Sequence, residues 1–199
     1  MIKLKQVLLI LGLLLLLPAT ARPAPGQDPE EGWQVYINVN EVQDLALEGG
    51  GAFGGGYTWV ATTGGVVCYS ASEQVKFTIT DGLADYRVYA ITRDGGGQWW
   101  FGTSRGASVL DAGGTPFDKG DDTWTTFTTA DGLVNDNVWT IAVDGGGRLW
   151  FGTWVGASVL DDGGTPFDKG DDSWITFTAA DGLASNDDVL AITEDNGGR

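Results

Sequence analysis

Residues 95–130 read GGGQWWFGTSRGASVLDAGGTPFDKGDDTWTTFTTA, and residues 145–180 read GGGRLWFGTWVGASVLDDGGTPFDKGDDSWITFTAA. Only eight of these 36 paired positions differ, so the chain contains an internal repeat with a period of 50 residues. The triplet Asp-Gly-Leu marks the same period, because it begins at Asp81, Asp131 and Asp181. A period of this length is typical of propellers, solenoids and other repeat architectures.

Each repeat contains four short segments rich in β-branched and aromatic residues, separated by turns rich in glycine and aspartate. In the second copy these segments are residues 88–93, 98–103, 107–111 and 124–129, and we expect each to form a strand. No stretch after residue 21 shows a sustained helical period, so helices should be few. The pattern predicts an all-β protein, a β-propeller of four-stranded blades. A solenoid of strands is the alternative, although its coils usually have shorter periods.

The repeat also predicts where the blades lie. They should occupy about residues 41–80, 81–130 and 131–180, with the start of a fourth at 181–199. A propeller needs about four to eight blades to close, so this one is incomplete. We therefore expect the chain to be part of a longer protein whose output module lies beyond Arg199. Residues 22–40 would be a lead-in segment.

The third copy contains Asp-Gly-Leu at 131–133, Val-Trp-x-Ile-Ala-x-Asp at 138–144, Gly-Arg-Leu-Trp-Phe-Gly-Thr at 147–153 and Gly-Ala-Ser-Val-Leu-Asp at 156–161. In this order the motifs resemble the two-component regulator propeller repeat, and the resemblance extends over roughly residues 41–199. In that family such repeats build periplasmic sensor regions, often ahead of a membrane span and a histidine kinase. The resemblance implies a ligand-sensing role and leaves the ligand open.

The N-terminus predicts export. Lys3 and Lys5 precede an apolar run at residues 7–17 and the small-residue ending Pro18-Ala19-Thr20-Ala21, which together are typical of a secretory signal peptide over residues 1–21. The apolar run is short for a membrane span, although an uncleaved anchor is the alternative. Cleavage after Ala21 would leave nine Lys and Arg against 27 Asp and Glu, a net charge of −18. We therefore expect a periplasmic or extracellular protein that does not bind nucleic acid.

Missing residue types restrict the chemistry. The chain has no histidine and a single cysteine, Cys68, which excludes an internal disulfide and the Ser-His-Asp and Cys-His nucleophile systems. Cys68 aligns with Val109 and Val159, so we expect it to replace a small core residue. We predict a non-catalytic region without a cofactor. Paired carboxylates could still cleave a glycoside, which keeps a propeller glycosidase as a lesser alternative.

Strand alternation places two sets of loops on one rim. The loops at 104–105 and 154–155 should share this rim with the crossovers at 81–87 and 131–137. The copies differ there, and also at the pair Tyr89 and Trp139, whereas the turn GGTPFDKGDD on the other rim is identical. A binding surface would vary in this way, because loops carry binding residues, but neutral drift after duplication explains the same pattern. The candidate ligand-binding residues are Trp154, Arg105, Tyr86, Arg87, Asn135 and Trp139.

Other aromatic and acidic residues have structural interpretations. Trp59, Trp100 and Trp150 occupy equivalent positions, as do Phe127 and Phe177, and we expect these five residues to form the core between blades. Six aspartates in the identical turns could supply oxygen ligands to Ca²⁺, namely Asp118, Asp121, Asp122, Asp168, Asp171 and Asp172. Their spacing does not match the EF-hand pattern, and aspartate is an ordinary turn residue, so solvated turns without a metal are the favoured interpretation.

The sequence thus predicts an exported, ligand-binding sensor propeller of a bacterial two-component protein. Its ligand would be a small molecule or an oligosaccharide, because exposed Trp, Tyr and Arg side chains suit stacking contacts with sugar rings. The full-length protein would reach the membrane through a C-terminal span and could form a dimer. A stand-alone exported binding or adhesion protein is the alternative that the same residues allow.

Overall fold

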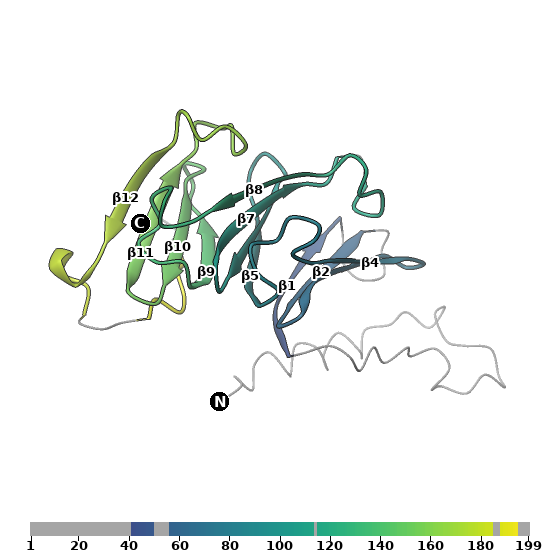
Figure 1. Ribbon diagram of the computed structural model, residues 1–199, viewed down its shortest axis with the longest axis horizontal. Coiled ribbons are helices and arrows are strands. Elements are labelled where there is room, and N and C mark those ends of the chain that lie inside the picture. The colour runs from purple at the N-terminus through teal and green to yellow at the C-terminus, as the bar shows by residue number, and fades with distance from the viewer. Residues whose placement is uncertain (1–40, 50–55, 114, 185–187, 195–199) are drawn as a thin grey trace. The chain divides into compact units, whose positions relative to one another are not determined.

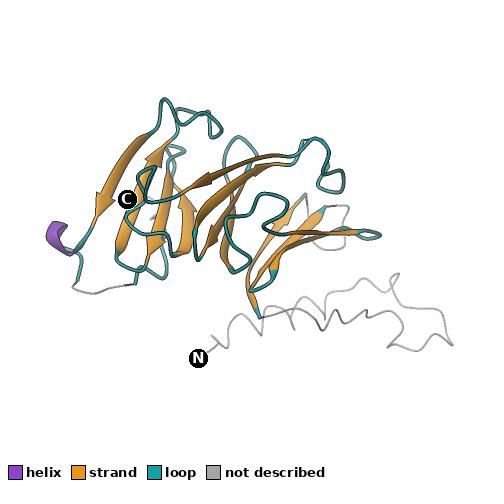
Figure 2. Ribbon diagram, viewed as in Figure 1, coloured by secondary structure: helices purple, strands orange, loops and turns teal. Residues whose placement is uncertain are grey.

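The computed structural model describes residues 41–49, 56–113, 115–184 and 188–194. The expected signal peptide at 1–21 and the lead-in at 22–40 lie outside the described residues. Within those residues, no helix is both long and apolar enough to cross a membrane. The described part consists of strands joined by turns, with one short 3-10 helix at Ala179–Asp181 (Figure 2).

Twelve strands form three sheets of four (Figure 1). Each sheet is an antiparallel meander in which neighbours along the chain pair, and we call the three sheets blades 1, 2 and 3. Blade 1 contains β1 (Val42–Glu48), β2 (Tyr57–Thr62), β3 (Gly65–Tyr69) and β4 (Gln74–Phe77). Blade 2 contains β5 (Val88–Arg93), β6 (Trp99–Thr103), β7 (Gly106–Asp111) and β8 (Thr123–Phe127). Blade 3 contains β9 (Val138–Val143), β10 (Leu149–Thr153), β11 (Gly156–Asp161) and β12 (Ser173–Phe177). The predicted all-β propeller of four-stranded blades is confirmed.

The blades share one strand register. Trp100 pairs with Val109 in blade 2 and Trp150 with Val159 in blade 3, and Trp59 pairs with Cys68 in blade 1. The single cysteine therefore occupies a position that valine fills elsewhere, and its side chain is buried. Burial also raises the pKa of the Cys68 thiol to about 12, so the thiol stays protonated and packs as a small apolar group.

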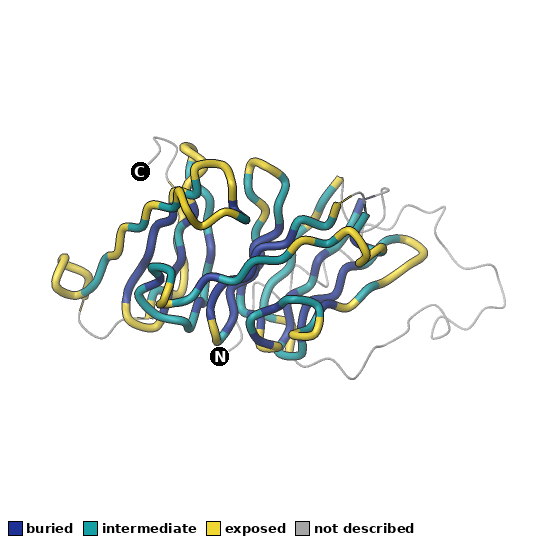
Figure 3. Tube along the Cα trace, turned by 45° about the horizontal axis from the view of Figure 1, so that its top comes forward, coloured by how far each residue is buried: buried dark blue, intermediate teal, exposed yellow. Residues whose placement is uncertain are grey.

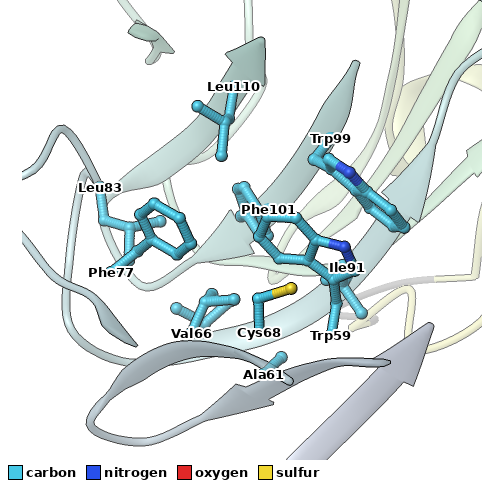
Figure 4. Close-up of a cluster of buried hydrophobic side chains, with 11 residues drawn as sticks. Trp59, Ala61, Val66, Cys68, Phe77, Leu83, Ile91, Trp99, Phe101 and Leu110 are labelled. Carbon is cyan, nitrogen blue, oxygen red and sulfur yellow. The ribbon is translucent and has the colours of Figure 1, made fainter. Parts of the chain in front are cut away.

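The core lies between neighbouring blades rather than within one. One buried cluster joins side chains of blades 1 and 2, among them Trp59, Phe77, Trp99 and Phe101 (Figure 4). The Trp59 ring centroid lies 4.8 Å from that of Trp99 and 6.1 Å from that of Phe101. A second cluster joins blades 2 and 3 in the same way. Adjacent sheets thus bury the faces that they turn toward each other, which is how a propeller generates its core.

Burial of the five expected core aromatics depends on the blade. Trp59, Trp100 and Phe127 are fully buried, and Figure 3 shows the buried residues as dark blue stretches of the chain. Trp150 and Phe177 stack on each other at 5.8 Å but are only half-buried. Trp59 and Trp100 are each also covered by an aromatic ring of the following blade, Phe101 and Phe151 respectively, whereas among the described aromatic rings Trp150 contacts only that of Phe177, in its own blade.

The identical turns form a clasp between blades. We call residues 115–122 of blade 2 and 165–172 of blade 3 the clasp loops. The ammonium group of Lys119 donates hydrogen bonds of 2.6 Å to Asp81 Oδ1 and to the Lys76 carbonyl of blade 1, and lies 4.8 Å from the Phe77 ring centroid. Lys169 repeats these contacts on blade 2, binding Asp131 and the Thr126 carbonyl at 2.6 Å each. The two identical turn sequences therefore make the same contacts with the blade that precedes them.

The Asp-Gly-Leu triplet is the receiving half of this joint. Asp81 accepts the clasp lysine, and Leu83 enters the core with 3% exposure. Gly82, with φ of 138°, is covered by the Trp124 indole of the following blade, so that an added Cβ would lie 2.3 Å from Trp124 Cγ. Gly132 is covered by Trp174 at the same 2.3 Å. Only glycine permits both this backbone conformation and this close approach.

Candidate functional site

The loops predicted to share a rim lie side by side in the structure. The Ser104 amide donates to the Arg87 carbonyl at 3.2 Å, and the Trp154 amide donates to the Asn137 carbonyl at 3.2 Å. The Gly106 amide reaches the Asp136 carbonyl of the next crossover at 2.7 Å. These bonds connect the β6–β7 and β10–β11 turns with the crossovers into one continuous belt of backbone, so side chains from two blades lie on a common surface.

An aromatic row runs along this rim. The ring of Tyr89 on β5 lies 4.4 Å from that of Trp139 on β9, centroid to centroid, at an interplanar angle of 34°. Trp139 in turn lies 6.5 Å from Trp154 in the β10–β11 turn. Trp154 is 55% exposed, while Tyr89 and Trp139 are half-buried. The row therefore presents large apolar ring surface to solvent from a rigid, packed base, which suits stacking against a planar or cyclic ligand.

Tyr89 was not among the candidate residues predicted from the sequence. The 50-residue period relates Tyr89 to Trp139, which was a candidate, so the repeat itself could have identified Tyr89. The strand register agrees, because the residues before them, Val88 and Val138, pair with Thr103 and Thr153. Tyr89 and Trp139 therefore occupy equivalent positions in adjacent blades. The loop residues Tyr86 and Arg87 lie just before β5, both exposed, with the Arg87 guanidinium 5.7 Å from the Tyr86 ring centroid.

Two further candidates have structural partners. Arg105 is exposed, but its Nε lies 3.1 Å from the buried carboxylate of Asp85. In blade 3 the same two positions are Asn135 and Val155, and Asn135 Oδ1 accepts the Asn137 amide as Asp85 Oδ1 accepts the Arg87 amide. The charged pair is thus exchanged as a unit for a neutral one. A buried aspartate is stabilised by a cation, whereas the neutral, half-buried Asn135 needs none, so the contact with Asp85 gives Arg105 a structural role.

The aspartates considered for calcium lie in the clasp loops and are mostly engaged. Asp118 and Asp168 each accept a backbone amide two residues ahead, from Gly120 and Gly170. Asp171 accepts the Thr165 hydroxyl at 2.9 Å. Among the described residues no group of three or more acidic, histidine or cysteine side chains converges as a metal ligand set.

Asp122 and Asp172 differ from the other four aspartates. Their carboxylate oxygens are buried and make no hydrogen bond of ordinary geometry within the described chain. Burial, aided by the Asp121 charge and opposed by Lys119, raises the pKa of Asp122 to about 6. Burial likewise raises the pKa of Asp172, with Asp162 and Asp171 adding to the effect. The raised pKa values mean that the folded state favours the protonated form of both carboxyl groups, so their ionisation lowers the free energy of unfolding.

Comparison with known proteins agrees with this architecture. Residues 132–155 match the sequence model of the two component regulator propeller family. Residues 132–155 therefore carry the pattern of a two component regulator propeller repeat. Those 24 residues cover Gly132, β9 and β10, together with Trp139 and Trp154. The matched residues thus include Gly132 and Leu133 of the receiving half of the clasp, but not Asp131, and two of the three rings of the aromatic row.

A solved structure shares the fold of this chain. The extracellular domain of a hybrid two-component system from B. thetaiotaomicron matches at 22% identity with a TM-score of 0.59, covering 79% of this chain and 19% of that one. The extracellular domain of a second hybrid system from the same organism matches at 19% identity with a TM-score of 0.49, covering 69% of this chain and 18% of that one. The chain thus spans about a fifth of the length of these proteins. No curated protein matches the sequence.

Proposed function

We propose that this chain is the extracytoplasmic, ligand-binding sensor propeller of a bacterial two-component signalling protein, and that the region binds without catalysing a reaction. The regulator propeller repeat at 132–155 and the likeness of fold to the extracellular domain of a hybrid two-component system support the sensor assignment. The predicted signal peptide supports export.

The aromatic row of Tyr89, Trp139 and Trp154 is the observation that carries this proposal. Large side chains normally bury their apolar surface, and Trp154 keeps more than half of its own in water. The Trp139 ring, which is itself packed on Tyr89, lies beside Trp154 and restricts it, so less side-chain entropy is lost when a ligand stacks on it. A carbohydrate ring, with one apolar face and hydroxyl groups at its edge, fits such a surface.

The electrostatics favour an uncharged ligand. The chain carries a formal net charge of −16, which repels anionic ligands at long range. Of the rim cations, Arg105 is already paired with Asp85. We therefore expect neutral oligosaccharides to bind more tightly than uronic-acid or sulfated ones.

The rim carboxylates support a non-catalytic role. A glycosidase needs one carboxyl group free to protonate the leaving oxygen and a second to act as base or nucleophile. Here Asp85 is held by Arg105 and the Arg87 amide, and Asp136 Oδ1 accepts the Thr129 amide at 2.7 Å. Both carboxylates organise the crossovers instead of facing a substrate.

The test is a titration of the purified protein with neutral oligosaccharides, namely cello-, xylo-, manno- and malto-hexaose, followed by tryptophan fluorescence. Trp154→Ala and Trp139→Ala should each weaken binding by about tenfold, the factor that corresponds to about 1.4 kcal/mol of stacking. Ile175→Ala is the matched control, because Ile175 is 53% exposed but lies on β12. Binding that survives both tryptophan substitutions would place the ligand elsewhere, and hydrolysis of a bound hexaose would refute the non-catalytic assignment.

A further inference from the structure

A cavity of about 430 Å³ lies between blades 2 and 3, at the rim opposite the aromatic row. The β5–β6 turn of blade 2 and the β9–β10 turn of blade 3 form two of its walls, and the loop after β11 forms the third. Its polar side chains are those of Asp94, Gln98, Asp161 and Asp162, and glycines make up most of the remaining wall. A cavity of this volume is large enough for a small organic ligand.

The equivalent place between blades 1 and 2 is filled by an arginine of the chain itself. There Arg93 Nη1 lies 2.8 Å from Glu48 Oε1, and Arg93 Nε donates to the Gly97 carbonyl at 2.9 Å. The guanidinium carbon of Arg93 lies 5.4 Å from the Trp99 ring centroid. Only about 90 Å³ stays open beside these side chains. The first joint between blades thus contains a guanidinium site that is already occupied.

Blade 3 replaces the side chains that fill this place. Val143 stands 50 residues after Arg93, at the same position of the strand pairing, and Leu149 stands where blade 2 has the neighbouring tryptophan. An added Cβ at Gly97 would lie 3.2 Å from Arg93 Nη2. At the equivalent Gly147 an added Cβ would meet no atom within 4 Å. The second joint is therefore more open because the chain supplies no guanidinium there.

The acidic residue at this joint has a guanidinium partner in the other two blades. Strand pairing gives Glu48, Asp94 and Asp144 the same position. Asp144 Oδ2 accepts Arg148 Nε at 2.9 Å together with an indole N–H of its own blade. Asp94 Oδ2 also accepts an indole N–H, but Gln98 stands in the place of Arg148, and no described lysine or arginine pairs with Asp94.

Blade 3 also adds a carboxylate to the second cavity. Asp162 stands 50 residues after Ala112, and each of the two lines the cavity of its own joint. Asp162 Oδ1 accepts the Gly164 amide at 2.9 Å, and no described lysine or arginine pairs with Asp162. Relative to the first joint, the second has therefore lost one positive charge and gained one negative charge.

We propose that the cavity between blades 2 and 3 binds the guanidinium group of a small organic cation, with Asp94 and Asp162 as its acceptors. The planar guanidinium group forms parallel hydrogen bonds with a carboxylate, and both partners of the equivalent acids in this chain are arginines. The net charge of −16 attracts a cation at long range. This site is separate from the aromatic row and does not depend on the ligand proposed there.

The test is a calorimetric titration of the purified full chain with arginine amide and with citrulline amide. In citrulline amide a neutral urea group of the same shape replaces the guanidinium group, so the two ligands differ only in that charge. Arginine amide should bind about tenfold more tightly or better, because hydrogen bonds to charged groups are the stronger ones. Its affinity should fall as the salt concentration rises, because salt screens the attraction.

Four variants locate the site. Asp94→Asn should weaken arginine amide binding by about tenfold or more, and Asp162→Ala, which restores the residue type of blade 2, by about threefold or more. Val143→Arg should abolish binding, because the new guanidinium group would fill the cavity as Arg93 fills the first one. Asp168→Asn is the matched control, since it removes an exposed carboxylate of blade 3 that does not line the cavity.

The outcomes decide between this site and its alternatives. Equal affinity for the two amides, or no saturable binding of either, would overturn the proposal. Equally tight binding of lysine amide would overturn the choice of a guanidinium group. Binding that survives Val143→Arg, or that Asp168→Asn weakens as much as Asp162→Ala does, would assign the cation to the acidic surface in general. If Asp94→Asn does not fold, Val143→Arg and Asp162→Ala decide the question.

Discussion

Replacing Lys119 with methionine should open the joint between blades 1 and 2. Methionine keeps the apolar stem over the Phe77 ring, from which the Lys119 ammonium group is 4.8 Å away, and removes only the charge. The substitution deletes two hydrogen bonds of 2.6 Å, to Asp81 Oδ1 and to the Lys76 carbonyl. Although burial raises the pKa of Asp81, the hydrogen bonds from Lys119 and Thr78 hold it below its usual value, as expected for a carboxylate that favours its charged form.

The size of the effect follows from the exposure of the pair. The side chains of Lys119 and Asp81 are 34% and 19% exposed, so the pair is neither a fully solvated ion pair nor a buried one. Exposed pairs contribute at most about 1 kcal/mol, and hydrogen bonds to charged groups contribute about 1.5–3 kcal/mol. We expect Lys119→Met to reduce the free energy of unfolding by about 1.5 kcal/mol.

Urea denaturation gives the magnitude and hydrogen exchange gives the location. Because repeat proteins are stabilised blade by blade, the loss of protection should be confined to residues 76–83 and 115–122. Lys169→Met is the internal control, since it should produce the same loss one blade further on. The Lys119→Met and Asp81→Asn changes should be clearly less than additive. An unfolding free energy within about 0.3 kcal/mol of the original, or additive effects of the two changes, would refute the clasp.

Three further predictions concern residues whose surroundings differ between copies. Gly82→Ala should destabilise the protein by about 3 kcal/mol or more in urea denaturation, because the new Cβ would collide with Trp124. In Gly182→Ala the new Cβ has no atom within 4 Å, so this change should cost only the backbone strain of about 1 kcal/mol. Equal effects of the two would contradict the packing argument. Arg105→Val should cost about 1–2 kcal/mol in thermal denaturation because it leaves the buried Asp85 unpaired, and Asp85→Asn should restore the loss by recreating the neutral pair of blade 3. Failure of the second change to rescue the first would show that Arg105 acts otherwise. The pKa of Asp122 in the folded protein is raised to about 6, so the stability that its protonation provides is lost as the pH rises through that value. Asp122→Asn removes this loss and should therefore stabilise the protein by about 1 kcal/mol near neutral pH, after allowance for solvent screening. This advantage should vanish below about pH 4, where the carboxyl group is protonated in both states, and an advantage independent of pH would exclude ionisation as its cause.

The repeat and the strands could be predicted because they depend on local patterns. The expected strand at 88–93 coincides with β5, and those at 98–103, 107–111 and 124–129 differ from β6, β7 and β8 by one or two residues at their ends. Alternating β-branched and aromatic residues bury one face, and the glycines with positive φ at 106 and 156 close the turns. The same local information placed Trp154 and Tyr86 on an exposed rim.

What the sequence by itself determined is therefore the repeated four-stranded unit and the residue types on each rim. Only the tertiary structure decided which repeated motifs meet, because Lys119 and Asp81 are 38 positions apart and belong to different blades. It also decided that Arg105 neutralises Asp85 and that Tyr89 joins Trp139 and Trp154. The physical reason is that burial depends on the neighbouring blade. Trp100 and Trp150 have nearly identical local sequences, yet one is covered by Phe151 and the other faces an open pocket.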